Sequence, residues 1–418
     1  MKNRFVVSAV VAGLAMTVLN AGKAQAIPAF ARQYKTECST CHTVFPDRNP
    51  FGEAFRKNSF VWPGKLTGQK QEEAKLVTED QKKTAQEWLV TIPELVPVAF
   101  WVQHDFIYNK NRFDDTGKKL PQFDLDGETE FELFTGGAFR DKAGWWAEYN
   151  ASEGEVGEAY IQIRKPVKLP LNVKAGKFKP QLSLWKPNDS ATISEYGFYE
   201  MTVGNSPFEI GREQGGVELN SVIGNRVFVA TGVVTPPEKD RNGPEWYGHA
   251  AVRIGGADYN GNAPEISLER ESVWDNLALT FGSFGYIGSS NGSPTPDTDH
   301  VANDFYRVGF EGEALYKKLR FRVNGILGKD DNPQGTVPAV SEKSLFLMAQ
   351  GQYIFMRNIL AAMRFEYQDV ENEGIVRRYI PSVTYAPWQN VRLALEYKHE
   401  IGETEITREG VMRVSFAF

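Results

Sequence analysis

The chain has few residues that could cross-link it or hold a metal ion. Its 418 residues include two cysteines and five histidines. Two cysteines are too few for the disulfide framework of a small secreted domain. A zinc site beside them would need further ligands at similar spacing, and no histidine or cysteine follows His42 until His104.

Long hydrophobic runs are also missing beyond the N-terminus. No such segment reaches 18 consecutive apolar residues, so no transmembrane helix is predicted. The negative mean hydropathy would ordinarily indicate a soluble protein. Outer-membrane barrels have similar averages, because every second residue of a strand faces the lumen. Hydropathy alone therefore does not separate the two classes.

The first 26 residues predict a secretory signal peptide. Lys2 and Arg4 precede an apolar stretch of 15 residues, and Ala24–Ala26 forms a small-residue cleavage site. The stretch is too short to span a bilayer, which takes roughly 20 residues. Cleavage before Ile27 removes three basic residues and changes the formal charge from −6 to −9. An acidic exported protein is a poor candidate for binding nucleic acid.

Both cysteines occur in the motif CSTCH, residues 38–42, which matches the attachment signature of c-type haem. Two thiols at this spacing can add to the two vinyl groups of one porphyrin, and the histidine that follows can ligate the iron. A small disulfide, a redox-active cysteine pair and half of a zinc site are the alternatives. We predict one covalent c-type haem, attached through Cys38 and Cys41, with His42 as the proximal ligand.

Residues 27–64 are predicted to form a small, mostly helical haem segment. A short helix is expected to open at Pro46, with Phe51 and Phe55 on one face, where they would pack against the haem. The segment is too short to build its own core. It must therefore be stabilised by packing against the rest of the chain, and we expect it to plug the lumen of a barrel formed by the later residues.

The sixth ligand of the iron is not supplied locally. No methionine and no second histidine lies between residues 43 and 100. Strand alternation places His249 and Met348 on the lumen face of their strands. The candidates for this position are His249, then Met348, then Met201, although each also suits a plain lining role.

Residues 65–94 are charged and are predicted to form a linker or a short helix. From residue 95 to 418 the chain consists of alternating segments of about ten residues, as in transmembrane barrels. Sixteen antiparallel strands are predicted, and a soluble all-β sandwich or propeller is the alternative. The expected strands span 97–109, 128–140, 143–150, 157–166, 171–180, 213–222, 226–234, 246–255, 273–286, 303–314, 318–328, 342–355, 358–370, 375–386, 390–400 and 408–418.

The connections favour the barrel. Short turns alternate with longer polar loops, as do the periplasmic turns and external loops of outer-membrane barrels. The third external loop, residues 181–212, corresponds in position and length to the porin loop that folds into the lumen; an exposed cap is the alternative. Acidic external loops could attract Fe(II) or another cation. The final residue, Phe418, closes an amphipathic strand, as in many outer-membrane barrels.

Residues 28–58, PAFARQYKTECSTCHTVFPDRNPFGEAFRKN, resemble the fused monohaem cytochrome–porins of iron-oxidising bacteria. The likeness lies in an AFARQ lead-in, the haem motif, and an N-x-FG-x-x-F helix after a proline. The stretch directly after His42, TVFPDRNP, departs from that pattern, which leaves the substrate open. The resemblance implies thioether attachment at Cys38 and Cys41, with His42 as proximal ligand.

The resemblance also implies an outer-membrane electron conduit, which would pass electrons from extracellular Fe(II) to a periplasmic carrier such as a soluble cytochrome. Electron export to minerals or electrodes is the reverse possibility. A diffusion or ligand-gated porin with a haem plug or sensor is a different class. An exported haem peroxidase or reductase is a third, and no local acid–base constellation supports it. The expected activity is electron transfer, in the form of ferrous iron oxidation.

Overall fold

The computed structural model describes residues 29–34, 36, 38–63, 98–109, 122–125, 127–139, 142–167, 169–187, 189–236, 242–259, 274–292, 301–356, 358–388, 390–403 and 405–417. The predicted signal peptide, the predicted linker at 65–94 and Phe418 lie outside these residues. No helix within the described ranges is long and apolar enough to cross a membrane.

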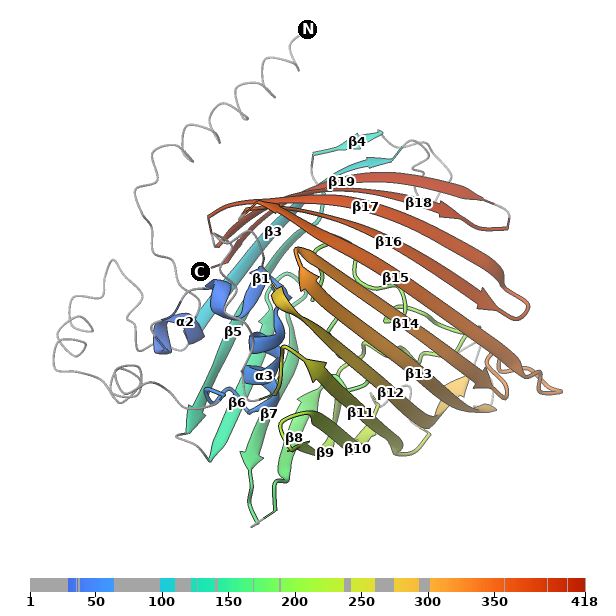
Figure 1. Ribbon diagram of the computed structural model, residues 1–418. Coiled ribbons are helices and arrows are strands. Elements are labelled where there is room, and N and C mark those ends of the chain that lie inside the picture. Colours follow the sequence, from blue (N-terminus) through green and yellow to red (C-terminus); the bar gives the residue numbers. More distant parts are fainter. Residues whose placement is uncertain are drawn as a thin grey trace, which may run out of the picture.

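Sixteen long antiparallel strands form a closed barrel, as predicted (Figure 1). Each long strand pairs with its neighbours in the chain, and β19 pairs with β3 to close the ring. A two-residue strand, β4 (Phe123–Asp124), adds to the end of β3. The long strands are β3 (Val98–Asn109), β5 (Thr129–Phe139), β6 (Ala143–Asn150), β7 (Glu155–Arg164), β8 (Asn172–Phe178), β9 (Gln214–Ile223), β10 (Val227–Thr235), β11 (Glu245–Gly255), β12 (Trp274–Gly292), β13 (Val301–Lys317), β14 (Leu319–Asp330), β15 (Glu342–Met356), β16 (Ile359–Val370), β17 (Gly374–Trp388), β18 (Val391–Ile401) and β19 (Ile406–Ala417).

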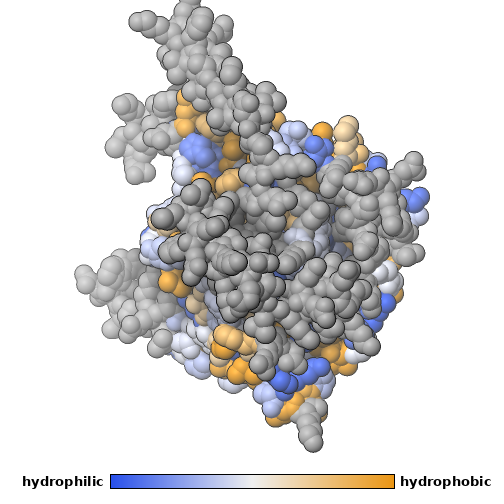
Figure 2. Space-filling view, turned by 90° about the vertical axis from the view of Figure 1, so that its left-hand side faces the viewer, coloured by the Kyte–Doolittle hydropathy of each residue, from blue (hydrophilic) through white to orange (hydrophobic). Residues whose placement is uncertain are grey.

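Side chains alternate between an apolar outer face and a polar inner face. On β14, Leu319 and Phe321 are about half exposed on the outside, whereas Arg320 and Arg322 are buried inside. Hydrophobic residues also occur on the outer surface in Figure 2. Because the pleat sends successive side chains to opposite faces, a chain of polar average composition builds an apolar exterior.

The alternation of short turns and long loops is less regular than predicted. Residues 256–273, between β11 and β12, form a long connection at the short-turn end, while 371–373 is a short one at the other end. The described part of the long connection turns inward. Tyr259 is fully buried, and its carbonyl oxygen accepts a 2.9 Å hydrogen bond from Asn58. This connection therefore holds the N-terminal segment.

The N-terminal segment is less helical than predicted. It consists of α2 (Ala29–Gln33), a 3₁₀ turn η1 (Cys38–Thr40), a hairpin of β1 (His42–Val44) and β2 (Asp47–Arg48), and α3 (Pro50–Lys57). The second helix begins at Pro50 rather than Pro46. Asn49 caps it by accepting a 2.9 Å hydrogen bond from the Gly52 amide, and proline suits the first helical position.

The third loop, residues 179–213, folds into the lumen, as in the porin-like expectation, and the exposed-cap alternative is wrong. Trp185, Tyr196 and Phe198 are buried in a cluster with inward-facing side chains of β10 to β15. The loop's amide groups are satisfied by glutamates of the wall. Glu311 accepts a 2.8 Å bond from Leu184, and the Gly197 amide donates a 3.0 Å bond to a carboxylate on β16. Loop and wall therefore fill this part of the lumen.

Candidate haem-binding site

The CSTCH motif lies on the inner side of the barrel, in the turn that joins η1 to β1. The Cys41 amide donates a 3.1 Å hydrogen bond to the Cys38 carbonyl, which closes the turn. Asn49 fixes the turn from outside, because its side-chain amide donates to the carbonyls of Ser39 and Thr40 at 3.2 and 3.1 Å. The two thiols are not joined as a disulfide.

His42 is held in the orientation that suits a metal ligand. Its Nδ1 lies 3.0 Å from the Pro46 carbonyl oxygen, which only accepts hydrogen bonds, so Nδ1 carries the proton. Nε2 is then left for a metal, a tautomer that such a bond commonly fixes. Burial, helped by the nearby Arg48 charge, lowers the pKa of His42 to about 4. The imidazole is therefore neutral, as metal ligation requires.

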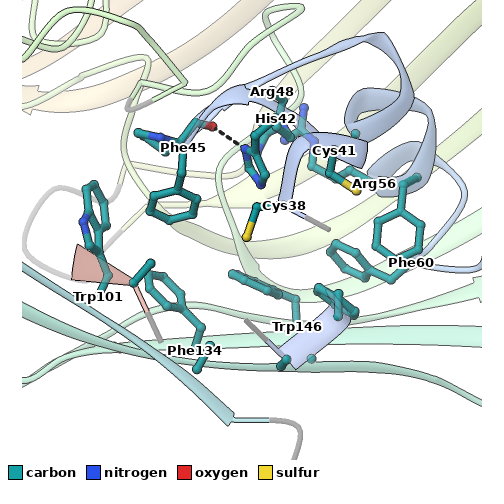
Figure 3. A pocket seen from close by; sticks show the side chains of 18 of the residues that line it. Cys38, Cys41, His42, Phe45, Arg48, Arg56, Phe60, Trp101, Phe134 and Trp146 are labelled. Atoms are coloured by element: carbon teal, nitrogen blue, oxygen red, sulfur yellow. Dashed lines mark hydrogen bonds between the residues drawn. The ribbon is translucent and has the colours of Figure 1, made fainter. Parts of the chain in front are cut away.

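The motif faces a cavity between the N-terminal segment and the barrel wall. The cavity contains about 1350 Å³ of space, its open mouth included. The Cys38 sulfur and the His42 ring point into it, opposite three wall aromatics (Figure 3). Those aromatics are Trp101, Phe134 and Trp146.

The rest of the lining is also mainly aromatic and comes largely from the segment itself. Phe30 stacks on Phe60, with ring centroids 4.9 Å apart, and Phe60 stacks on Trp146 at 5.6 Å. Phe45 meets Trp101 edge-to-face at 5.5 Å. Segment and wall therefore share one apolar core, which supplies the packing that the short segment lacks.

Glycine permits the close approach of segment and wall at two positions. A Cβ added to Gly144 would lie 1.8 Å from the Ser59 carbonyl oxygen, and one added to Gly136 would lie 2.8 Å from the Phe30 ring. Both distances are shorter than van der Waals contact. Any side chain on these lumen positions of β5 and β6 would push the segment away from the wall.

Buried charges dock the segment elsewhere on the wall. Asp47 is fully buried and pairs with Arg320 at 2.9 Å and with Arg322 at 3.1 Å. Arg48 pairs with Asp189 of the third loop at 3.0 Å. Wall, third loop and N-terminal segment are thus joined by one set of ion pairs, and removal of either partner would leave a buried charge.

The predicted site residues do not all meet. Phe55 lines the cavity, but Phe51 does not and instead packs on Trp62 with centroids 4.9 Å apart. His249, Met348 and Met201 face the lumen, but none of the three lines the cavity. Their positions are those of lumen packing. His249 Nε2 lies 2.6 Å from a carboxylate oxygen of Glu311, and both methionines belong to the cluster around the third loop.

Sequence reasoning missed the wall aromatics and the docking charges. Strand alternation predicts that Trp101, Phe134 and Trp146 face inward, but it does not say which of sixteen strands meets the segment. The residues present fit a c-type haem: two thiols outside any disulfide, a neutral imidazole with Nε2 unassigned, and a broad aromatic slot. No group of three or more His, Cys, Asp or Glu side chains within the described ranges forms an alternative metal-ion site.

No family model matches the chain, and no curated protein matches it in sequence. Solved structures do match. An anion-selective porin from Comamonas acidovorans is 10% identical with a TM-score of 0.56, over 77% of this chain and 99% of that one. OmpF of Salmonella typhi, in complex with daunomycin, is 10% identical with a TM-score of 0.51, over 77% and 97%. OmpT of Vibrio cholerae is 11% identical with a TM-score of 0.50, over 77% and 97%. The chain has the closed β-barrel fold of the porins.

Proposed function

We propose that the protein is an outer-membrane electron conduit that uses one covalent c-type haem to pass electrons between extracellular Fe(II) and a periplasmic carrier such as a soluble cytochrome. The observation that carries this proposal is the convergence of Cys38, Cys41 and His42 on one aromatic cavity inside a barrel. The apolar exterior suits outer-membrane lipid, and the barrel wall separates the cavity from it.

Each residue of the site has a defined part in this function. Cys38 and Cys41 attach the cofactor, and His42 offers Nε2 while the Pro46 carbonyl oxygen fixes its ring. The aromatic walls exclude water and keep the site at low dielectric. When bound, the haem supplies a one-electron iron couple, whose potential depends on axial ligands, burial and nearby charge.

A second cavity supports an approach for cations from the long-loop end. It contains about 1020 Å³ and is lined by seven glutamates against four lysines and arginines. Pro46, Trp101 and Glu148 line both this cavity and the aromatic one. An acidic chamber raises the local concentration of a divalent cation. We infer that Fe(II) gives up its electron here, beside the edge of the aromatic cavity.

A third cavity supports an exit at the short-turn end. Cys38 and His42 line it together with Asn358, Pro387 and Trp388, which belong to the turns after β15 and β17 or flank them. A periplasmic carrier that docks on these turns would come close to the motif. Reverse flow, to extracellular minerals or electrodes, would use the same path.

The purified protein in detergent tests the proposal through its visible spectrum and a redox titration with and without Fe(II). A c-type spectrum that Fe(II) reduces rapidly is the expected result. A covalent haem of low potential, untouched by Fe(II), would reverse the direction to electron export. A protein from cells competent in haem attachment that carries no covalent haem would overturn the conduit.

A diffusion porin is the second candidate, because the chain shares the porin fold. The third loop packs against β10 to β15 and the N-terminal segment packs against β3, β5 and β6, so the proposed conduit should conduct few ions, whereas a diffusion pore needs an open lumen. Planar-bilayer recording separates the two candidates. Steady, large conductance of the haem-loaded protein would favour the porin, and a nearly silent bilayer would favour the conduit.

A further inference from the structure

The wall of the aromatic cavity is apolar except on one side. Arg48, Arg56 and Lys186 line it there, and Glu148 is the acidic side chain among the lining residues. Arg48 and Arg56 come from the haem segment, whereas Lys186 comes from the third loop. A flat, apolar tetrapyrrole carries two carboxylate side chains at one edge, and a basic edge on an otherwise apolar slot matches that shape.

The guanidinium of Arg56 has few hydrogen-bond partners among the described residues. Its Nε is buried and has no hydrogen-bond partner among the described residues. Its guanidinium reaches Glu53 at 3.4 Å, but Arg48 and Lys57 hold the same carboxylate more closely, at 2.6 and 2.8 Å. One carboxylate thus serves three cations, and these hold the pKa of Glu53 well below its usual range although burial alone would raise it. The cluster has positive charge left over.

Lys186 lines the same side of the cavity as Arg48 and Arg56. It pairs with Glu158 of β7, and its side chain is largely buried. Burial lowers the pKa of Lys186 to about 8; Glu148 opposes the shift, and the charges of Arg56 and Arg48 add to it. An ammonium group has three N–H donors, so Lys186 can bind a further carboxylate beside that of Glu158.

We propose that Arg56 and Lys186 bind the two propionate carboxylates of the haem. The inference rests on the proposed function, since it assumes the haem. Arginine offers a fork of N–H donors that matches a carboxylate, and lysine offers a compact charge. The third loop then becomes part of the cofactor site. It carries one of the two anchors, and through Asp189 it also holds Arg48 in place.

The test uses the haem-loaded, full-length protein and the variants Arg56→Gln and Lys186→Gln. Each should weaken the hydrogen bonding of one propionate, which resonance Raman spectroscopy detects as a shift of the propionate-bending band. Loss of a positive charge favours the oxidised haem, so the midpoint potential should fall. A shift of about tenfold in the redox equilibrium, equivalent to 59 mV for one electron, is expected.

Two matched variants control for general effects. Lys186→Arg keeps the charge and should retain the wild-type band and potential. Lys179→Gln removes a lysine of the same loop that pairs with Glu213 and lines the acidic cavity instead, so the band should not move. If Lys186→Gln fails to fold, the propionate band of Arg56→Gln alone tests the proposal.

Unchanged propionate bands in both Gln variants would overturn the anchors while leaving the conduit intact. Haem missing from the wild-type protein would instead remove the proposed function. The two failures are therefore distinguishable.

Discussion

The two sides of the lumen are built differently. Against β10 to β15, the third loop buries aromatic and aliphatic side chains in one continuous cluster that includes Trp185 and Phe346. Against β3 and β5 to β7, the lumen keeps two large cavities, one aromatic and one acidic. The third loop fills one side of the lumen, and the other side keeps cavities beside the cysteine motif.

The contrast shows how a porin-type barrel can fill one side of its lumen and keep cavities on the other. Buried apolar area on the closed side holds the loop, since each large side chain contributes roughly 1.5–3 kcal/mol when buried. On the open side, charge pairs such as Asp47 with Arg320 position the haem segment while leaving space beside it. Different strands therefore line the filled side of the lumen and the side that keeps cavities.

The largest expected effect comes from removing the attachment thiols. The double variant Cys38→Ser, Cys41→Ser should lose all covalent haem, because no thiol remains to form a thioether. Haem staining after denaturing electrophoresis measures the loss. The barrel should still migrate as a compact form when unheated, since its ladder does not involve the motif. Retention of covalent haem in the variant would contradict the assigned attachment.

Removing the third loop should make the two sides of the lumen alike. Replacing residues 183–211 by a short Gly/Ser turn empties the cluster against β10 to β15, so the lumen should conduct ions. Single-channel recording should show large steps that the parent protein lacks. A silent variant that still forms a barrel would mean that other segments close the lumen.

Loss of one docking charge should have the next largest effect. Asp47→Asn leaves Arg320 and Arg322 to share the carboxylate of Glu313, and breaking a buried pair typically costs about 3–5 kcal/mol. The haem segment should detach more readily, which limited proteolysis within residues 38–63 measures. Lys398→Gln removes a partly exposed pair with Glu409 and should change stability by no more than about 1 kcal/mol.

Local pattern predicted the barrel closely. The expected strand 143–150 coincides with β6, and 342–355 differs from β15 by one residue. The largest error is at β12, which was expected to end at residue 286 and continues to Gly292. Its last residues, IGSSNG, have the composition of a loop, but pairing with β13 extends the strand there. Turn composition is a local signal, and tertiary pairing overrode it.

The site was predictable only where its signal is local. Cys38, Cys41 and His42 lie within five consecutive positions, so the haem prediction rests on a local motif. Trp146 belongs to the site because the N-terminal segment, far away in the chain, packs against it. Asp47 belongs to it because this residue anchors the segment to the wall. No spacing rule in the sequence predicts either contact. For Phe51, helical periodicity predicted a position on the same face as Phe55, facing the haem. In the structure the Phe51 ring packs on Trp62 instead.

Phe51 and Phe55 provide a matched pair of variants that tests which residues line the aromatic cavity. Phe55→Ala opens a void in the ring cluster with Phe30 and Tyr34, and such truncations cost about 3–5 kcal/mol. It should also shift the haem absorption band. Phe51→Ala should leave the band in place, because this ring does not line the cavity. Equal band shifts in the two variants would contradict the assignment of the cavity wall.

The smallest effect is expected in the acidic cavity, where the charges act at a distance. Replacing Glu130, Glu153 and Glu155 by glutamine keeps the shape of the chamber and removes three of its negative charges. The second-order rate of haem reduction by Fe(II) should fall by roughly three- to tenfold at low salt, since clefts of one sign enhance association with opposite charges by 10-fold or more.

Salt and a neutral reductant separate this steering from damage to the site. At high ionic strength the variant and the parent should converge, because screening removes the attraction in both. A neutral hydroquinone should reduce both proteins at the same rate at any salt concentration. If the hydroquinone rate falls together with the Fe(II) rate, the glutamates shape the haem site itself and the acidic cavity is not a cation path.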